Sequence, residues 1–216
     1  MKKVSKVPPR VKRKFVKKVD KAFLTPYKLA ELEYMLKELE FGVDITNNTI
    51  FLNSEVSTDS LYETIARFNF LVRCNGTVRP INLNVSSFGG DVYAMFGIHD
   101  YMRNFPIKID TICIGPAMSA AAFLLASGTG TRYMTENSTV MFHQFNITMD
   151  GKTTNVVSNA SHIKKLQSRA DALLGKYTKK TKGFWEKETN EDLYLSAQEC
   201  LQYGIIDKII TLPESK

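Results

Sequence analysis

Short apolar runs with the alternation of β-strands are separated along this chain by longer segments with helical periodicity. Strand-like runs occupy residues 49–53, 81–85, 107–115, 139–143 and 205–210, and helices are expected at 26–41, 58–73, 92–102, 119–126, 156–178 and 197–203. Strands that alternate with helices form βαβ units, and their right-handed crossovers produce a mostly parallel sheet. The pattern therefore predicts an α/β fold, and 216 residues suffice for one such domain plus an arm.

Local signals mark the ends of two of these helices. Thr25 as N-cap and Pro26 in the first turn predict the start of the first helix, and Gly42 its end. The last helix should begin at the capping box of Ser196 and end at Gly204. The first helix carries leucines at helical spacing, which we expect to form its apolar face: Leu29, Leu32, Leu36 and Leu39.

The positive charge is concentrated in an arm at residues 1–24. Residues 1–21 contain ten Lys and Arg against Asp20 alone, a net charge of +9. The whole chain carries +7, so the rest sums to −2, and a nucleic-acid or membrane partner would have to bind the arm. The longest apolar run, about a dozen residues, is shorter than a membrane-spanning helix. No apolar signal segment is visible either, so we expect no membrane partner and no secretory signal.

Cysteine usage indicates a reduced, cytoplasmic protein. Cys74, Cys113 and Cys200 are odd in number, far apart in the sequence and not at zinc-binding spacing. Cys113 lies in a strand pattern and Cys200 in a helix pattern, so we interpret both as core residues. The sequence therefore predicts neither a disulfide framework nor a metal site.

Three strand-to-helix or strand-to-loop junctions are candidates for the functional site: "SSFGGD" (86–91), "GPAMSA" (115–120) and "FHQF" (142–145). In open α/β sheets, functional groups gather beyond the carboxyl ends of the strands. Ser119 opens a helix among small residues, where unpaired N–H groups can stabilise an oxyanion. Most serines in such segments are packing residues, so a catalytic role requires a base nearby.

The chain has only three histidines, and His143 alone ends a strand at a junction. His99 and His162 lie within predicted helices, where packing and solvated positions are the ordinary interpretation. Spacing alone cannot choose a third catalytic group among 22 acidic residues; Asp192 is one candidate. Gly89 and Gly90 indicate either a tight turn or exposed backbone amides, and no Walker or GxGxxG motif is present.

Four segments together resemble the ClpP family, the proteolytic subunits of the Clp protease (peptidase family S14). They are "SSFGG" (86–90), "GPAMSAAAFLLASG" (115–128), "VMFHQF" (140–145) and "EDLYLSAQECLQYGIIDKI" (191–209), in the family's order and spacing. The resemblance covers about residues 45–211. It implies a crotonase-like α/β protease domain at 25–216, with a long handle helix at about 156–178 and a basic N-terminal arm.

The resemblance also implies roles for individual residues. Ser119 would be the nucleophile, His143 the general base and then acid, and Asp192 the residue that orients His143. The backbone N–H groups of Gly90 and Ala120 would form the oxyanion hole. The implied reaction is peptide-bond hydrolysis through an acyl-enzyme, with no metal or cofactor in the protease subunit.

Family members assemble, which implies partners for this chain. The expected assembly is a homo-oligomer of heptameric rings, stacked in pairs around a chamber. A Clp-type ATPase unfoldase would use ATP to feed it unfolded proteins or peptides.

The sequence departs from the family pattern at four positions. Phe88 and Phe145 replace prolines, Glu191 replaces the arginine beside the triad aspartate, and Asn190 replaces an acid. We expect weaker ring pairing from the last two changes. Three other interpretations are a catalytically silent or regulatory ring subunit of a Clp complex, a crotonase-type acyl-CoA enzyme, and a nucleic-acid binder acting through its basic arm.

Overall fold

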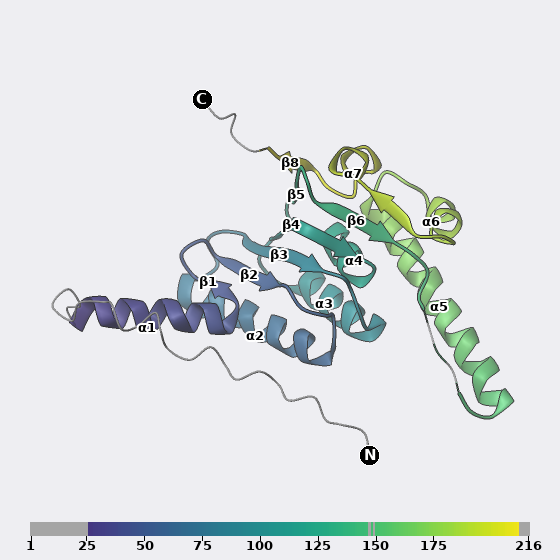
Figure 1. Cartoon of the computed structure of the whole chain (residues 1–216), viewed down its shortest axis with the longest axis horizontal. Coiled ribbons are helices and arrows are strands. Elements are labelled where there is room, and N and C mark those ends of the chain that lie inside the picture. Colours follow the sequence, from purple (N-terminus) through teal and green to yellow (C-terminus); the bar gives the residue numbers. More distant parts are fainter. Residues whose placement is uncertain (1–25, 147, 149, 212–216) are drawn as a thin grey trace, which may run out of the picture.

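The computed structural model describes residues 26–146, 148 and 150–211, so the predicted arm and the predicted N-cap Thr25 lie outside the described residues. The helices are α1 (Pro26–Phe41), α2 (Thr58–Asn75), α3 (Val92–Asn104), α4 (Ala120–Ala126), α5 (Thr153–Tyr177), α6 (Lys182–Glu188) and α7 (Ala197–Tyr203). The strands are β1 (Val43–Asp44), β2 (Thr49–Leu52), β3 (Ile81–Ser87), β4 (Ile109–Met118), β5 (Arg132–Thr135), β6 (Thr139–Phe142), β7 (Leu193–Leu195) and β8 (Lys208–Ile210). The fold is a mixed α/β domain, as predicted (Figure 1).

The strands form one sheet in the order β1-β2-β3-β4-β5-β8. Pairing from β2 to β8 along this path is parallel, and α2 and α3 make the crossovers between β2, β3 and β4. Strand β4 forks: residues 111–113 pair with β5, whereas residues 116–118 pair with β6. Strand β7 then adds to β6 in antiparallel orientation. The fork carries β6 and β7 away from the main sheet and toward the end of β4.

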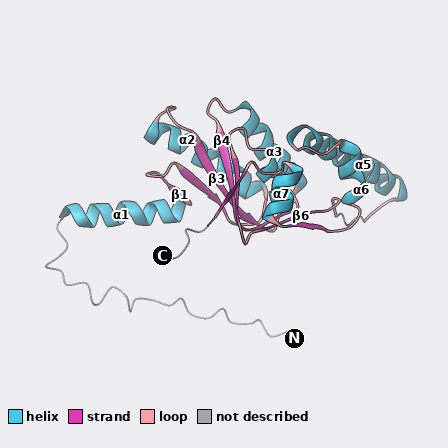
Figure 2. Ribbon diagram, turned by 90° about the horizontal axis from the view of Figure 1, so that it is seen from above, coloured by secondary structure: helices cyan, strands magenta, loops and turns pink. Residues whose placement is uncertain are grey.

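The helices cover the sheet unevenly. Helix α2 packs against α3 and α3 against α4, on one side of the sheet, while α1 and α5 extend at opposite ends of the molecule (Figures 1 and 2). Strand β3 alternates buried Ile81, Leu83 and Val85 with partly exposed asparagines, and all seven residues of α4 are buried. The core therefore lies between β3, β4 and the layer of α2, α3 and α4.

Most predicted elements are present, with differences that have physical causes. Sequence periodicity did not indicate β5, β7 or α6, which are only three to seven residues long. The spacing of apolar residues in α2 predicts a buried face formed by Leu61, Ile65, Phe68 and Val72. The observed buried face lies about one residue away, at Ser60, Thr64, Phe68 and Leu71. The predicted apolar face of α1 is exposed at Leu32, Leu36 and Leu39, because among the described residues this helix lies beyond the edge strand β1 and packs mainly against that strand. The side chain of Leu29, the fourth residue of this face, is not among those described.

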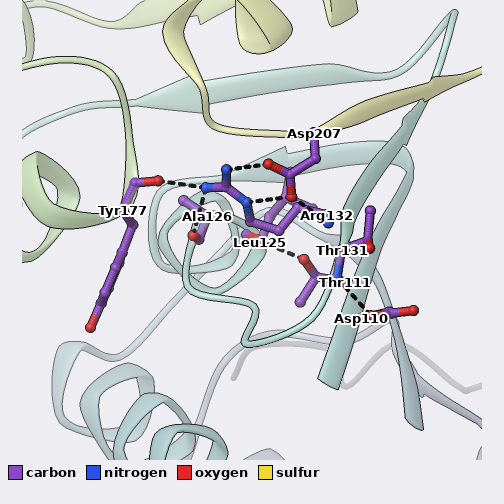
Figure 3. Close-up of polar contacts among 8 residues, drawn as sticks. All are labelled: Asp110, Thr111, Leu125, Ala126, Thr131, Arg132, Tyr177 and Asp207. Carbon is purple, nitrogen blue, oxygen red and sulfur yellow. Dashed lines mark hydrogen bonds and ion pairs between the residues drawn. The ribbon is translucent and has the colours of Figure 1, made fainter. Parts of the chain in front are cut away.

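A largely buried arginine joins the ends of four elements (Figure 3). The Arg132 side chain donates from Nε and Nη2 to the Asp207 carboxylate (3.0 and 2.7 Å). Its Nη1 donates to the carbonyl oxygens of Ala126 and Tyr177, at the C-terminal ends of α4 and α5. Burial alone would raise the pKa of Asp207, but the hydrogen bonds and charge of Arg132, with the charge of Lys179, outweigh burial and lower it. This cluster anchors the helix whose other end begins at Ser119.

Candidate active site

Ser119 lies in the tight turn between β4 and α4. Its backbone has φ 54° and ψ −120°, a conformation that residues with a Cβ seldom adopt. Its N–H donates to the carbonyl of Met141 on β6 (2.7 Å), and its carbonyl accepts from Phe123 N–H in α4 (3.1 Å). The turn is thus held from both sides, and such strained positions cluster at functional sites.

His143 follows β6 directly and faces Ser119. Because β6 pairs with the end of β4, with Met141 opposite Met118, the residues just beyond the two strands are neighbours. The His143 Nε2 lies 2.8 Å from the Ser119 Oγ, a hydrogen-bond distance. The structure therefore brings together the serine and the histidine that the sequence singled out.

Among the described residues, two polar side chains lie near the other ring nitrogen of His143, Nδ1. Asp192, immediately before β7, lies beside it because β7 pairs with β6, but its Oδ1 is 3.9 Å from the His143 Nδ1 and its side chain is 55% exposed. The Nδ2 of Asn146 is closer to Nδ1, at 3.4 Å. The predicted partner Asp192 is therefore near His143 but beyond hydrogen-bond length. No pattern in the sequence pointed to Asn146.

Two glycines form the opposite wall. Gly89 and Gly90 have φ of 98° and 148°, and a Cβ at Gly89 would lie 2.6 Å from the carbonyl oxygen of Met118. Val56 binds the residues that flank Gly90, accepting from Asp91 N–H and donating to the Gly89 carbonyl, so the N–H of Gly90 points away from Val56. Glycine is therefore required here by close backbone approach as well as by conformation.

A pocket of about 430 Å³ joins these groups. Gly90, Ser119 and His143 line it together with apolar and aromatic side chains, among them Phe88, Tyr93, Met141, Phe145 and Ile163. Two of the departures from the family pattern, Phe88 and Phe145, thus lie in the wall of this pocket. The pocket offers an apolar surface beside a hydroxyl group that is hydrogen-bonded to an imidazole.

The remaining histidines and the buried cysteines lie elsewhere in the fold. His99 is buried and contacts Asp100 and the Tyr177 hydroxyl, and desolvation lowers its pKa. His162 is exposed and hydrogen-bonds the hydroxyl of Tyr93. Burial raises the pKa of Cys113 to about 11 and that of Cys200 to about 12, so neither is a ready nucleophile at neutral pH.

The other two departures lie near the site as well. The Oδ1 of Asn190 accepts a hydrogen bond from the Gln144 side chain (2.5 Å), and Glu191 is exposed. Within the described part of the chain, no cluster of three or more His, Cys, Asp or Glu residues could hold a metal ion. No described helix is both long and apolar enough to cross a bilayer.

Comparison with known families agrees with the resemblance noted in the sequence. The model of the Clp protease family matches residues 41–213. This span contains every strand, helices α2 to α7, and Ser119, His143 and Asp192. Since the match covers most of the chain and its entire described sheet, the protein belongs to the Clp protease family and is a ClpP-type serine peptidase.

Proposed function

We propose that the protein is a serine endopeptidase that hydrolyses unfolded polypeptides with Ser119 as nucleophile and His143 as general base. The observation that carries this proposal is the 2.8 Å contact between the Ser119 Oγ and the His143 Nε2, made from a strained turn. An imidazole at this distance can accept the hydroxyl proton as the oxygen attacks a peptide carbonyl.

The reaction follows from the groups around Ser119. Attack by Oγ moves its proton to the His143 Nε2 and creates an oxyanion, for which we propose the N–H groups of Gly90 and Ala120 as donors. The amide of Ala120 is the first of α4 and has no acceptor within the helix. His143 then donates its proton to the leaving amine, and a water molecule activated by the same nitrogen hydrolyses the acyl-enzyme.

Asp192 has to move closer to His143 for this chemistry. His143 accepts a proton at Nε2 only if Nδ1 carries one, and an ionised carboxylate, which can only accept, stabilises that tautomer. A hydrogen bond would require Asp192 to approach from 3.9 Å by about 1 Å. The loose contact is also the one observation that favours the alternative, a catalytically silent ring subunit.

For the assembly, we propose heptameric rings, stacked in pairs, that a cytoplasmic Clp-type ATPase unfoldase supplies with substrate. The exposed apolar side chains of α1, at Leu32, Leu36 and Leu39, support burial in an oligomer. The protease subunit would use no metal or cofactor, whereas the unfoldase partner would hydrolyse ATP.

We expect the pairing of rings to be weaker than in a family member that has arginine at position 191. A carboxylate cannot replace a guanidinium donor, so Glu191 loses that ion pair and the apolar contacts of α5 would have to compensate. Sedimentation velocity at micromolar protein should detect single rings in equilibrium with double rings. Double rings that persist at nanomolar protein and high salt would contradict this expectation.

A fluorophosphonate probe tests the enzymatic proposal directly. The wild type should be labelled at Ser119 and should cleave a fluorogenic peptide, while Ser119→Ala should do neither although native mass spectrometry finds the same assembly. A wild type that assembles but is neither labelled nor active would instead identify a silent ring subunit.

A further inference from the structure

The loop that follows His143 is held to the helices by its backbone. Gln144 N–H donates to the carbonyl of Thr189, at the end of α6 (2.9 Å). Phe145 N–H donates to the side-chain Oε1 of Gln167, on α5 (2.9 Å). Gln167, 22 residues further along the chain, therefore provides one of the two bonds that anchor the backbone N–H groups of the two residues directly after the proposed base.

A buried carboxylate holds Gln167 in turn. Because Phe145 N–H is a donor, the oxygen of the Gln167 side-chain amide must face it. The Nε2 group then points toward the residue one helical turn further along α5. There it donates to the Oδ1 of Asp171 (2.8 Å). Asp171 is only 2% exposed, and desolvation raises its pKa despite the hydrogen bond from Gln167. Burying a carboxyl group costs free energy, and burial alone would favour an apolar residue at this position. The carboxyl group of Asp171 therefore indicates that the position requires a hydrogen-bond acceptor for Gln167.

We propose that Gln167, held by Asp171, is a positioning residue that fixes the backbone carrying His143 relative to Ser119. The proposal rests on the proposed function, in which His143 is the base. Phe145 also lines the pocket beside Ser119. The side-chain amide of Gln167 therefore positions both the backbone next to the base and one wall of the pocket. Misplacement of a catalytic group by about 1 Å can lower a rate as much as 100-fold.

One pair of substitutions at Asp171 separates hydrogen bonding from charge. Asp171→Asn keeps an oxygen that accepts from Gln167, so kcat for a fluorogenic peptide should stay within about twofold of wild type. Asp171→Leu has a similar size but no acceptor, and kcat should fall about tenfold with a smaller change in KM. Equal kcat values for the two variants would overturn the proposal.

A second set, at position 167, uses pH. In Gln167→Glu two carboxylates face each other, and they should share a proton at low pH but repel at high pH. Gln167 and Asp171 line a cavity together with Lys164 of α5 and Glu186 of α6. The charges of Glu186 and Lys182 also act on Asp171, and all three of these charged residues are the same in every variant. The activity of Gln167→Glu relative to wild type should therefore rise as pH falls from 8.5 to 5.5.

The double variant Gln167→Glu/Asp171→Asn exchanges the amide and the carboxylate. Its carboxylate can accept from both Phe145 N–H and the new amide, so kcat at pH 8 should recover to within about threefold of wild type. Gln198→Glu, the same substitution at an exposed position of α7, is the matched control and should have no pH-dependent effect.

Melting temperature and native mass are measured on each full-length variant, since a merely structural role would change stability without the pH-dependent recovery of kcat. A flat activity ratio across pH and no recovery in the double variant, with an active wild type, would refute the inference alone. A wild type that neither cleaves peptide nor reacts with the probe would refute the proposed function, and this inference with it.

Discussion

The backbone of Ser119 permits a test of the site that does not depend on activity. Its φ of 54° and ψ of −120° resemble the first central position of a type II′ turn, which glycine adopts without strain. Ser119→Gly and Ser119→Ala both remove the hydroxyl group and its hydrogen bond to His143. The difference in stability between the two variants therefore isolates the backbone conformation.

The expected difference follows from two opposing terms. A residue with a Cβ in such a conformation costs about 1–3 kcal/mol. Glycine avoids that strain but loses about 0.5–1 kcal/mol more conformational entropy on folding. The free energy of unfolding of Ser119→Gly should thus exceed that of Ser119→Ala by about 1 kcal/mol. Alanine should be the more stable residue at position 122, inside α4, where Ala122→Gly should lower the free energy of unfolding by at least about 1 kcal/mol.

Urea unfolding followed by tryptophan fluorescence suits this comparison, because Trp185 is the single tryptophan and is fully buried. All variants are compared at one protein concentration, since assembly adds to apparent stability. If Ser119→Ala proves as stable as Ser119→Gly, residue 119 does not adopt this conformation. The turn conformation that directs the Ser119 hydroxyl group toward His143 would then be incorrect.

Three further predictions concern catalysis, pH and the arm. His143→Ala should reduce peptide hydrolysis as severely as Ser119→Ala, by roughly 10⁶ in kcat, and the double variant should be no worse, because the residues act as a unit; additive losses would exclude His143 as the base. The lowered pKa of Asp207 means that its ionised form, bound to Arg132, adds stability above the unfolded pKa of about 4. That contribution is lost as pH falls through the folded pKa, so in urea titrations from pH 7 to 3 wild type should lose its advantage over Asp207→Asn; a constant difference would contradict the assignment. Removal of residues 1–24 should leave the melting temperature nearly unchanged, and failure to fold would contradict the interpretation of this segment as an arm.

The sequence by itself determined those features that depend on neighbours in the chain. The capping box of Ser196 and Glu199 and the left-handed Gly204 delimit α7 as predicted, because these signals act within one turn of a helix. The alternation of strands and helices predicted the parallel sheet for the same reason, since it reflects burial of one face of each element. Ser119 was a candidate because it opens a helix among small residues, and His143 because it alone of the three histidines ends a strand.

Only the tertiary structure decided how these segments meet. The fork of β4 places His143 beside Ser119, and the pairing of β7 with β6 brings Asp192 close without closing the 3.9 Å gap. The hydrophobic periodicity of the sequence did not predict the contacts of Gln167 with Phe145 and Asp171. A hydrogen bond between a side chain and a backbone 22 residues away depends on how the helix and the loop dock, whereas periodicity records only which face of an element is buried.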